Sequence, residues 1–444
     1  MRDLALTFLL IAIIYYSFKR PYIGVCAWIW IALTAPADWA FGFSTNFRLN
    51  LTVVIITFLS YLFVSKNKKF KLSGIGVLVL LFGFWTLVSS LASITSFPEE
   101  VWFRFSEFLK VLMLFFFAIL IFKKRLHIDT FVWAIVLSIS SYAAMEATKF
   151  ILSGGSHRIV GVAGQIQDRN DLAVAINMCI PLVIYLIQTC EHKILKNGLW
   201  VLLGLNIMAV VGTYSRGGFI GLIILAIAFW WKSKHKLMLS LAAVCIIPIM
   251  YMNAPQEWKE RQSTVETAAI EDGSFIGRLW AWKISTLIAL DNPMTGGGFR
   301  AVTDPFIWDY YRSLTPDFSF LKTPPISIEV APKAAHNIYM QVLGDHGFVG
   351  LALFLAILLK TLSLNNRNRK LAKEYGNLWC EHLSNALSLS LIGFCITGAN
   401  VSRAYFDLLY AVVAIVVVIS TNHLAKKYNI KTVKNTAAIK SVET

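Results

Sequence analysis

The chain has 444 residues, of which 57% are hydrophobic and only 15% are charged, whereas an ordinary soluble domain is about 25% charged. This composition indicates an integral membrane protein with little room for a large soluble domain. The formal net charge is +16, but the basic residues fall mainly in short loops between apolar segments, so the charge reflects membrane topology rather than a nucleic-acid partner. The six cysteines are spaced singly, which argues against both a disulfide framework and a zinc site.

Apolar stretches of about 20 residues, the length that crosses a bilayer, recur along almost the whole chain. The first one, residues 4–18, is followed by Lys19-Arg20-Pro21 and not by a small-residue cleavage site, so we take it as a span and not as a signal peptide. Two of these stretches, residues 4–18 and 237–252, are short for a span, so the expected count is a range. The sequence predicts an all-α polytopic membrane protein with about 12–13 transmembrane helices.

Lysine-rich clusters separate the apolar runs into pairs, so every cluster can lie on the cytoplasmic side. The clusters are residues 19–20, 66–71, 123–125, 193–196, 232–236, 367–373 and 426 onward. This pattern predicts an N-terminus outside and a C-terminus inside the cell. We expect four segments: a transmembrane bundle at 1–252, a long periplasmic loop at 253–346, further transmembrane helices at 347–425 and a basic cytoplasmic tail at 426–444.

The short outer loops are poor in lysine but contain arginine, against the topological bias. These arginines are Arg48, Arg104, Arg158, Arg169, Arg216 and Arg403. The planar guanidinium binds phosphate in a bidentate way that lysine cannot, so the group predicts a phosphate-bearing ligand. For any single arginine the alternative is that its side chain extends to a lipid headgroup.

Two of these loops carry recognisable patterns. "GTYSRGGFIGL" (residues 212–222) places Arg216 at the end of a span, with two following glycines that allow close approach of a ligand or partner. "RIVGVAGQIQDRNDLAVAINMCIPL" (residues 158–182) leads from Arg158 into a span that Asn170 or Asp171 caps. A plain hairpin turn and a plain helix cap are the alternatives for each motif taken alone.

The outer segment 253–335 is the one soluble-looking region. Within it, "GSFIGRLWAWKISTLIALDNP" predicts a helix with Ser274 as N-cap and a stop at Asn292-Pro293, lying on the membrane surface or against the bundle. "MTGGGFRAV" then forms a glycine turn, and a Pro-rich stretch follows. An irregular segment of this length indicates function.

The stretch "PKAAHNIYMQVLGDHGFVG" predicts a short helix at 335–343, a break at 344–347 and then a span. His336 would stand at the start of this helix, outside the hydrocarbon, where a group that titrates near neutral pH can act as a general base. A capping or packing histidine is the alternative. We expect His346, beside Asp345 at the break, to satisfy local backbone groups.

"YSRGG", "GRLWAW" and "HNIYMQVLGDHGFVG" resemble the O-antigen ligase and Wzy-type polymerase superfamily. The first 43 residues, with "RIVGVAGQIQDRNDLA" and "NPMTGGGFRAVT", resemble the O-glycosylation ligases found with exosortase A systems. The resemblance extends to about residue 364. It implies a GT-C-type glycosyltransferase of the bacterial inner membrane that works without a metal or other cofactor. Such an enzyme transfers a glycan from undecaprenyl diphosphate to a lipid, glycan or protein acceptor on the periplasmic face.

The resemblance also implies roles for individual residues. His336 takes the place of the essential histidine, while Arg216, Arg278 and Arg158 are the diphosphate contacts. The residues expected to support the site are Asn337, Tyr214, Arg169, Asp345 and His346. The family often has glutamate where this chain has Asp345, which is a departure from the pattern.

The residue types suit this chemistry, because arginines aimed at a leaving diphosphate stabilise the transition state and a neutral histidine can deprotonate the acceptor. A polymerase that uses another lipid-linked repeat unit as acceptor stays open, because the donor and the chemistry are shared. A transporter of lipid-linked sugars is the alternative from another class, but transporters place polar groups near the bilayer midplane. Glu146 and Lys149, one turn apart, are expected to form a local ion pair.

Overall fold

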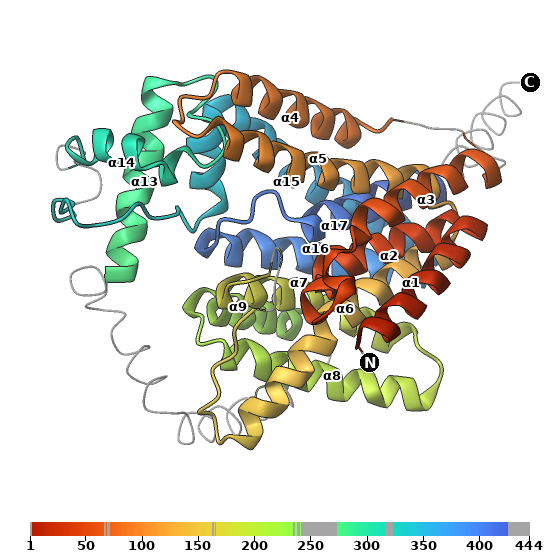
Figure 1. Cartoon of the computed structure of the whole chain (residues 1–444). Coiled ribbons are helices and arrows are strands. Elements are labelled where there is room, and N and C mark those ends of the chain that lie inside the picture. The colour runs from red at the N-terminus through yellow and green to blue at the C-terminus, as the bar shows by residue number, and fades with distance from the viewer. Residues whose placement is uncertain are drawn as a thin grey trace, which may run out of the picture.

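The structure is a computed structural model, and it describes residues 2–65, 68, 72–161, 164, 166–233, 236–237, 240, 273–315 and 323–424. Within these ranges every regular element is a helix (Figure 1). The prediction of an all-α membrane protein is confirmed. The expected span at 237–252 and the basic tail at 426–444 lie almost entirely outside the described residues.

The N-terminal half consists of helices that follow one another through short connections. They are α1 (Arg2–Lys19), α2 (Pro21–Thr34), η1 (Pro36–Trp39), η2 (Phe43–Asn46), α3 (Leu49–Val64), α4 (Gly74–Leu91), α5 (Pro98–Ile121), α6 (Arg125–Leu152), α7 (Arg169–Thr189), α8 (Lys193–Gly212) and α9 (Arg216–Lys232). The C-terminal half contains α13 (Gly273–Asp291), η3 (Ala301–Thr303), α14 (Pro305–Arg312), α15 (Ile338–Glu374), α16 (Leu378–Thr397), η4 (Gly398–Asn400), α17 (Asp407–Val418) and η5 (Ile419–Leu424).

Seven of the described helices are long and apolar enough to cross a membrane, and three shorter ones, α2, α3 and α9, are also apolar. The seven are α4, α6, α7, α8, α15, α16 with η4, and α17 with η5. Two more expected spans, α1 and α5, are helical but carry several charges. In α5 these charges fall within PEEVWFRFSEFLK, the stretch with which the helix begins. The chain is therefore a multi-pass membrane protein.

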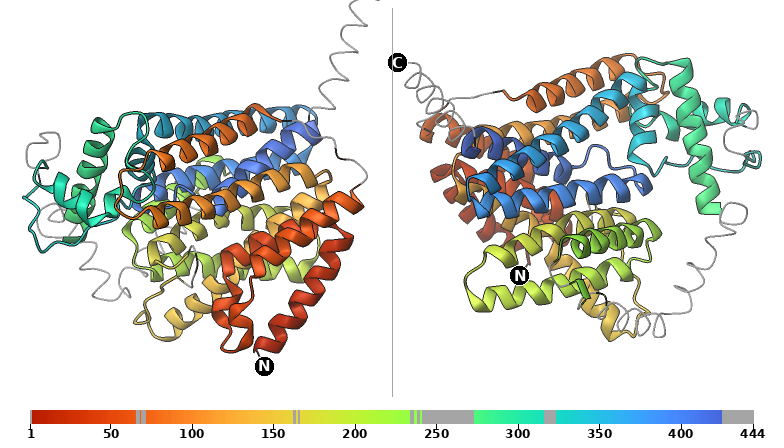
Figure 2. Two further views of the ribbon diagram at one scale, coloured as in Figure 1. Left: turned by 45° about the horizontal axis from the view of Figure 1, so that its top comes forward. Right: turned by 180° about the vertical axis from the view of Figure 1, so that it is seen from behind.

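The bundle helices run side by side, and α7 and α17 lie deepest within it, with 83% and 78% of their most apolar windows buried. Both are apolar around their whole circumference, as a helix enclosed by others must be. Figure 2 shows α13 standing at one end of the bundle, across the direction of its helices.

The region around α13 has a small core of its own. Trp280 and Ile284 of α13 pack there with Trp308 and Tyr311 of α14. α13 ends at Asp291, in agreement with the predicted stop at Asn292-Pro293. The side chain of Ser274, the expected N-cap, lies outside the described part of the chain.

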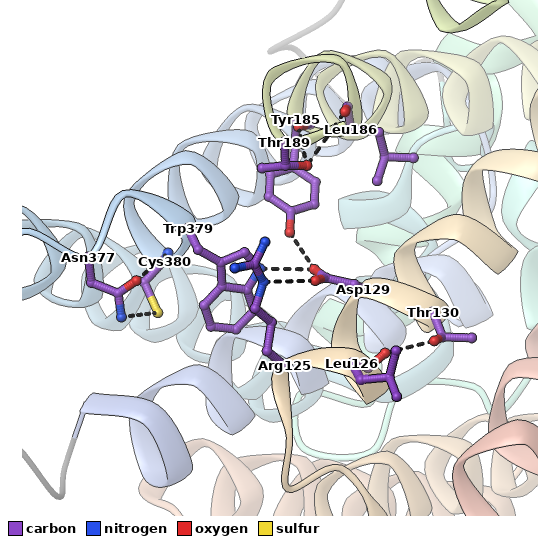
Figure 3. Close-up of polar contacts among 10 residues, drawn as sticks. All are labelled: Arg125, Leu126, Asp129, Thr130, Tyr185, Leu186, Thr189, Asn377, Trp379 and Cys380. Carbon is purple, nitrogen blue, oxygen red and sulfur yellow. Dashed lines mark hydrogen bonds and ion pairs between the residues drawn. The ribbon is translucent and has the colours of Figure 1, made fainter. Parts of the chain in front are cut away.

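Asp129 joins three helices at the opposite end of the bundle (Figure 3). Its carboxylate accepts hydrogen bonds from the Tyr185 hydroxyl at 2.5 Å, the Trp379 indole at 2.9 Å and Arg125 Nε at 3.0 Å. The guanidinium of Arg125 also lies over the Trp379 ring. These contacts tie the start of α6 and the start of α16 to the end of α7, so the helices are fixed far from α13.

The expected ion pair between Glu146 and Lys149 is present at 2.7 Å. His157 lies at 2.7 Å from the second oxygen of Glu146. Glu146 therefore contacts both Lys149 of its own helix and His157 in the loop after α6.

Candidate active site

His336 lies two residues before the start of α15, in a conformation that an L-residue rarely adopts. The helix begins at Ile338 because Asn337 is its cap: Asn337 Oδ1 accepts from the N–H of Tyr339 at 2.9 Å and of Met340 at 3.2 Å. The expected start at 335 was therefore too early. His336 has a φ of 44°, and its N–H donates to Ser402 Oγ at 2.9 Å. Strain of this kind persists only where the surroundings hold it, as at many functional sites.

The predicted break in α15 is confirmed at Gly347, whose φ of 67° and ψ of −168° are not helical. A β-carbon at this position would lie 2.6 Å from the carbonyl oxygen of Met294. The glycine turn after α13 packs against the break, since Gly297 N–H donates to Gly344 O and Gly298 N–H to Asp345 O, both at 2.9 Å. Two motifs that are distant in the sequence thus form one unit.

Asp345 holds this unit from the inside. Its Oδ1 accepts from the N–H of Arg300 at 3.0 Å, and its Oδ2 accepts from the Tyr405 hydroxyl at 2.9 Å. The neighbouring His346 is fully buried and its Nδ1 lies 2.8 Å from Ser89 Oγ of α4. The expectation that His346 serves local backbone groups was wrong, because the break turns its ring toward a different helix.

The starts of α7 and α9 meet beside this unit. Asp168, and not Asn170 or Asp171, is the cap of α7, because its Oδ1 accepts from the N–H of Asn170 at 2.7 Å. The Asn170 side chain instead accepts from Ser215 Oγ at 2.7 Å, and Ser215 caps α9 through the N–H of Gly218. Both helices therefore present their first turns to the same place.

Residues 400–405, between α16 and α17, contact all of these elements. Arg403 Nη2 lies 2.5 Å from Asp171 Oδ2, and Ala404 N–H donates to Gln341 Oε1 at 3.1 Å. Together with the bonds of Ser402 to His336 and of Tyr405 to Asp345, this loop joins α7 to α15. Sequence analysis singled out only Arg403 here.

Asn400 brings α9 and α13 to the same loop. Arg278 Nη1 of α13 donates to Asn400 Oδ1 at 3.2 Å. Gly217 packs so closely on Asn400 that a β-carbon there would lie 2.6 Å from it. The first turn of α9, which begins at Arg216, and Arg278 of α13 come from separate motifs and thus meet at one asparagine.

A cavity of about 1330 Å³ opens beside His336. Its lining includes Arg48, Arg104, Arg300 and Arg403 from four different segments. The described residues that line it include His336 and Asp345 but not Arg216, Arg278 or Arg158. None of the three motif arginines is therefore among these lining residues, whereas Arg48, Arg104 and Arg403 belong to the group of outer-loop arginines expected from the charge pattern.

The other predicted residues have structural partners or lie farther out. The Tyr214 hydroxyl donates to Gly155 O at 2.8 Å, which ties the turn before α9 to the loop after α6. Arg169 is the first residue of α7 and is half-buried. Arg158 is exposed in the loop before it.

The surroundings of His336 lower the pKa of its imidazole below the ordinary value of 6.5. Burial is the largest cause, and the positive charges of Arg278 and Arg403 add to it, while Asp168 and Asp171 oppose it. The ring is therefore neutral at pH 7, the form that accepts a proton.

Four non-glycine residues of the described chain have a positive φ: Ala35, Tyr214, Arg300 and His336. Three of them, Ala35, Arg300 and His336, line the cavity. This clustering of backbone strain independently points to the cavity as a functional place. The described residues contain no group of three His, Cys, Asp or Glu side chains that could hold a metal ion.

Comparisons with known proteins divide the chain into two parts. Residues 1–191 match a family of unknown function, DUF5935. No curated protein matches the chain. Residues 201–355, which contain Arg216, Arg278 and His336, match the family described as O-Antigen ligase, and this match supports the expected ligase and polymerase superfamily and a glycosyl-transferring activity.

Proposed function

We propose that this protein transfers a glycan from undecaprenyl diphosphate to an acceptor hydroxyl on the periplasmic face of the bacterial inner membrane, without a metal. The observation that carries the proposal is the position of His336, a neutral histidine beside Arg278 at the wall of a large cavity. The O-Antigen ligase match over residues 201–355 gives the class of reaction.

In the proposed step the acceptor oxygen attacks the anomeric carbon of the donor glycan, and its proton passes to a ring nitrogen of His336. The bond between the anomeric carbon and the diphosphate oxygen breaks, and its electron pair leaves with the lipid diphosphate. Attack from the side opposite the leaving group inverts the anomeric configuration. The product retains one new glycosidic bond, so atoms and charge balance.

Arg278 and Arg216 are the proposed contacts of the diphosphate. Negative charge grows on the leaving group as its bond breaks, so guanidinium groups directed at it stabilise the transition state more than the ground state. Arg278 contacts Asn400 directly, and Arg216 immediately precedes Gly217, which packs on the same asparagine. Arg158 and Arg169 are proposed as weaker, outer contacts.

A ligase for a lipid or protein acceptor and a polymerase that extends a lipid-linked repeat unit share this donor chemistry. We favour the ligase, in keeping with the resemblance to exosortase-associated enzymes. The experiment below distinguishes the two, because it shows which acceptor the protein glycosylates.

The test is glycan transfer by the purified full chain in nanodiscs, with an undecaprenyl-diphosphate glycan, a chelator and a panel of acceptors. We expect the wild type to transfer and His336→Ala to bind the donor without transferring. Transfer by His336→Ala at the wild-type rate would falsify the assignment of the base, and loss of wild-type activity in chelator would contradict metal independence.

A further inference from the structure

We propose that the turn after α13, residues 292–298, is a re-entrant segment of the membrane, with the Met294 side chain among the acyl chains of the leaflet on the α13 side. The partner of this surface is the hydrocarbon of the bilayer and not another protein. The inference goes beyond the proposed function and does not depend on it. It places part of the segment expected as a periplasmic loop, residues 253–346, inside the membrane.

The depth of the turn follows from its bonds to α4. Trp85 Nε1 donates to Met294 O at 3.2 Å, and Ser89 Oγ donates to Thr295 O at 2.6 Å. α4 has 18 residues, a length of about 27 Å, and a hydrocarbon core is about 30 Å thick, so the whole helix is needed to cross it. Trp85 lies about 9 Å along the axis from the end of α4 at Leu91. Met294 therefore lies below the level at which α4 leaves the hydrocarbon.

α15 holds the turn from the other side. Phe348 N–H donates to Pro293 O at 2.9 Å. The backbones of the turn and of the break in α15 are in direct contact, since a β-carbon on Gly296 would lie 2.5 Å from Gly347 N. Residues 296–298 are buried. The turn is thus packed between two helices that are long and apolar enough to span a bilayer.

The carbonyl groups of the turn are bonded as a membrane interior requires. Non-helical backbone at membrane depth is tolerated where protein buries it and supplies its hydrogen-bond partners. Besides the bonds to Met294 O and Thr295 O, Gly297 O accepts from Ser93 Oγ at 2.9 Å and from the N–H of Ile94 at 3.1 Å. A turn in water could leave such carbonyls to the solvent. Protein donors at all three favour a place that water does not reach.

The donors stand in a row at every fourth residue of the chain. Trp85 and Ser89 lie one turn apart on the same side of α4, and Ser93 follows directly after the helix end. Polar side chains within a span are costly and usually serve a function. Each of these three donates to a carbonyl of residues 294–297, so holding the turn at this depth accounts for all of them.

The side chains that point away from this packing are apolar and exposed. Met294 is 57% exposed, Leu290 at the end of α13 is 55% exposed and Phe348 of α15 is 44% exposed. Exposed apolar surface of this kind marks a site of contact with a protein or a membrane. Lipid is the occupant that the position favours, because α4 beside the turn exposes Phe84 and Leu91 along its own membrane-spanning length.

Spin-label accessibility in nanodiscs measures the depth of the turn. Each label is attached to one new cysteine of the full chain, in a background whose six native cysteines are replaced by alanine. Met294→Cys is compared with Phe84→Cys of α4, the membrane reference, and with Tyr310→Cys of α14, the water reference. The three native side chains are 57%, 61% and 63% exposed, so a difference in exposure does not account for a difference in the result.

We expect the label at Met294 to collide with molecular oxygen, which concentrates in hydrocarbon, more than with a water-soluble nickel complex. Its ratio of the two collision rates should be close to that of Phe84 and several-fold above that of Tyr310. A ratio equal to that of Tyr310 would overturn the inference, because it would place Met294 in water.

A second measurement uses the chain with its native cysteines. Trp85→Phe keeps a ring and removes the N–H that lies 3.2 Å from both Met294 O and His346 O. Trp102→Phe of α5, where the native side chain is 41% exposed, is the matched control. We expect Trp85→Phe alone to lower the unfolding temperature, by about 2–4 °C for one lost hydrogen bond, because no water replaces the indole at membrane depth.

A shift for Trp85→Phe no larger than that of the control would contradict the inference, since it would mean that water reaches Met294 O. Neither measurement requires glycan transfer. A wild-type protein that transfers no glycan would count against the proposed function and leave the depth of the turn as measured, so the two failures are distinguishable.

Discussion

The backbone N–H of His336 donates to Ser402 Oγ over 2.9 Å, which joins the residue before α15 to the loop before α17. Of these two residues only His336 has a positive φ, and the bond holds its backbone in that conformation. The orientation of the proposed base therefore depends on a hydroxyl 66 residues away along the chain.

Ser402→Ala should lower kcat about five- to tenfold, because a hydrogen bond of this kind contributes about 1 kcal/mol and the backbone of His336 can relax without it. Steady-state transfer assays with saturating donor give the value. Ser402→Thr retains the hydroxyl and should keep most of the rate. Equal rates for the alanine variant and the wild type would show that the bond does not orient the base.

The pH dependence of transfer should follow the neutral form of His336. Its pKa is lowered below 6.5 by burial and by Arg278, so the rate should be constant around neutral pH and fall as the pH drops through that lowered pKa. Arg278→Gln removes a positive charge and should raise the pKa, which moves the acid limb of kcat/KM to higher pH. Arg312→Gln, at the last residue of α14 where the guanidinium pairs with Asp309, is the control. A limb that stays in place or moves to lower pH would contradict the assignment.

Arg403 and Asp171 should be coupled in stability. The Asp171 side chain is only 9% exposed and the Arg403 side chain 26%, so Arg403→Gln leaves a buried carboxylate without its cation, a loss of about 1–3 kcal/mol. Asp171→Asn with Arg403→Gln should unfold at a higher temperature than the sum of the single effects predicts. Thermal unfolding of the four proteins in detergent measures the coupling, and strictly additive shifts would mean that the pair contributes nothing.

The hydrogen bonds of Asp129 should affect stability and leave catalysis unchanged. Tyr185→Phe removes the bond from the Tyr185 hydroxyl to this carboxylate (Figure 3), and a bond to a charged group contributes about 1.5–3 kcal/mol. We expect Tyr185→Phe to unfold at a lower temperature than the wild type. At temperatures where the variant is folded, its kcat should equal the wild-type value. Tyr310→Phe, whose ring is 63% exposed, is the matched control. A fall in kcat at a temperature where the variant is folded would link this end of the bundle to the active site.

Most of the helices could be predicted because each is specified by its own residues. The length of an apolar run decides whether it can span a bilayer, and the stop of α13 at Asp291 follows from the Asn292-Pro293 pair beside it. The break at Gly347 is equally local, because glycine adopts a positive φ without strain.

The details that sequence reasoning missed depend on contacts between distant segments. Asp168, Asn170 and Asp171 are all good caps, and only the position of Ser215 explains why Asn170 does not cap α7. Asn400 is an ordinary polar residue in a short loop, and its importance appears only when Arg278 and Gly217 are seen on either side of it. No pattern within residues 398–406 indicated that the loop joins the predicted motifs.

The length of α15 makes the position of the proposed base sensitive to the thickness of the bilayer. The helix has 37 residues, and the part beyond Gly347 is about 40 Å long at 1.5 Å per residue, against about 30 Å for the hydrocarbon core. The surplus at its far end contains Arg369, Lys370 and Lys373, which can anchor among lipid phosphates. Because the same helix starts two residues after His336, a thinner or thicker membrane that tilts α15 would shift the depth of the imidazole relative to any lipid-borne substrate.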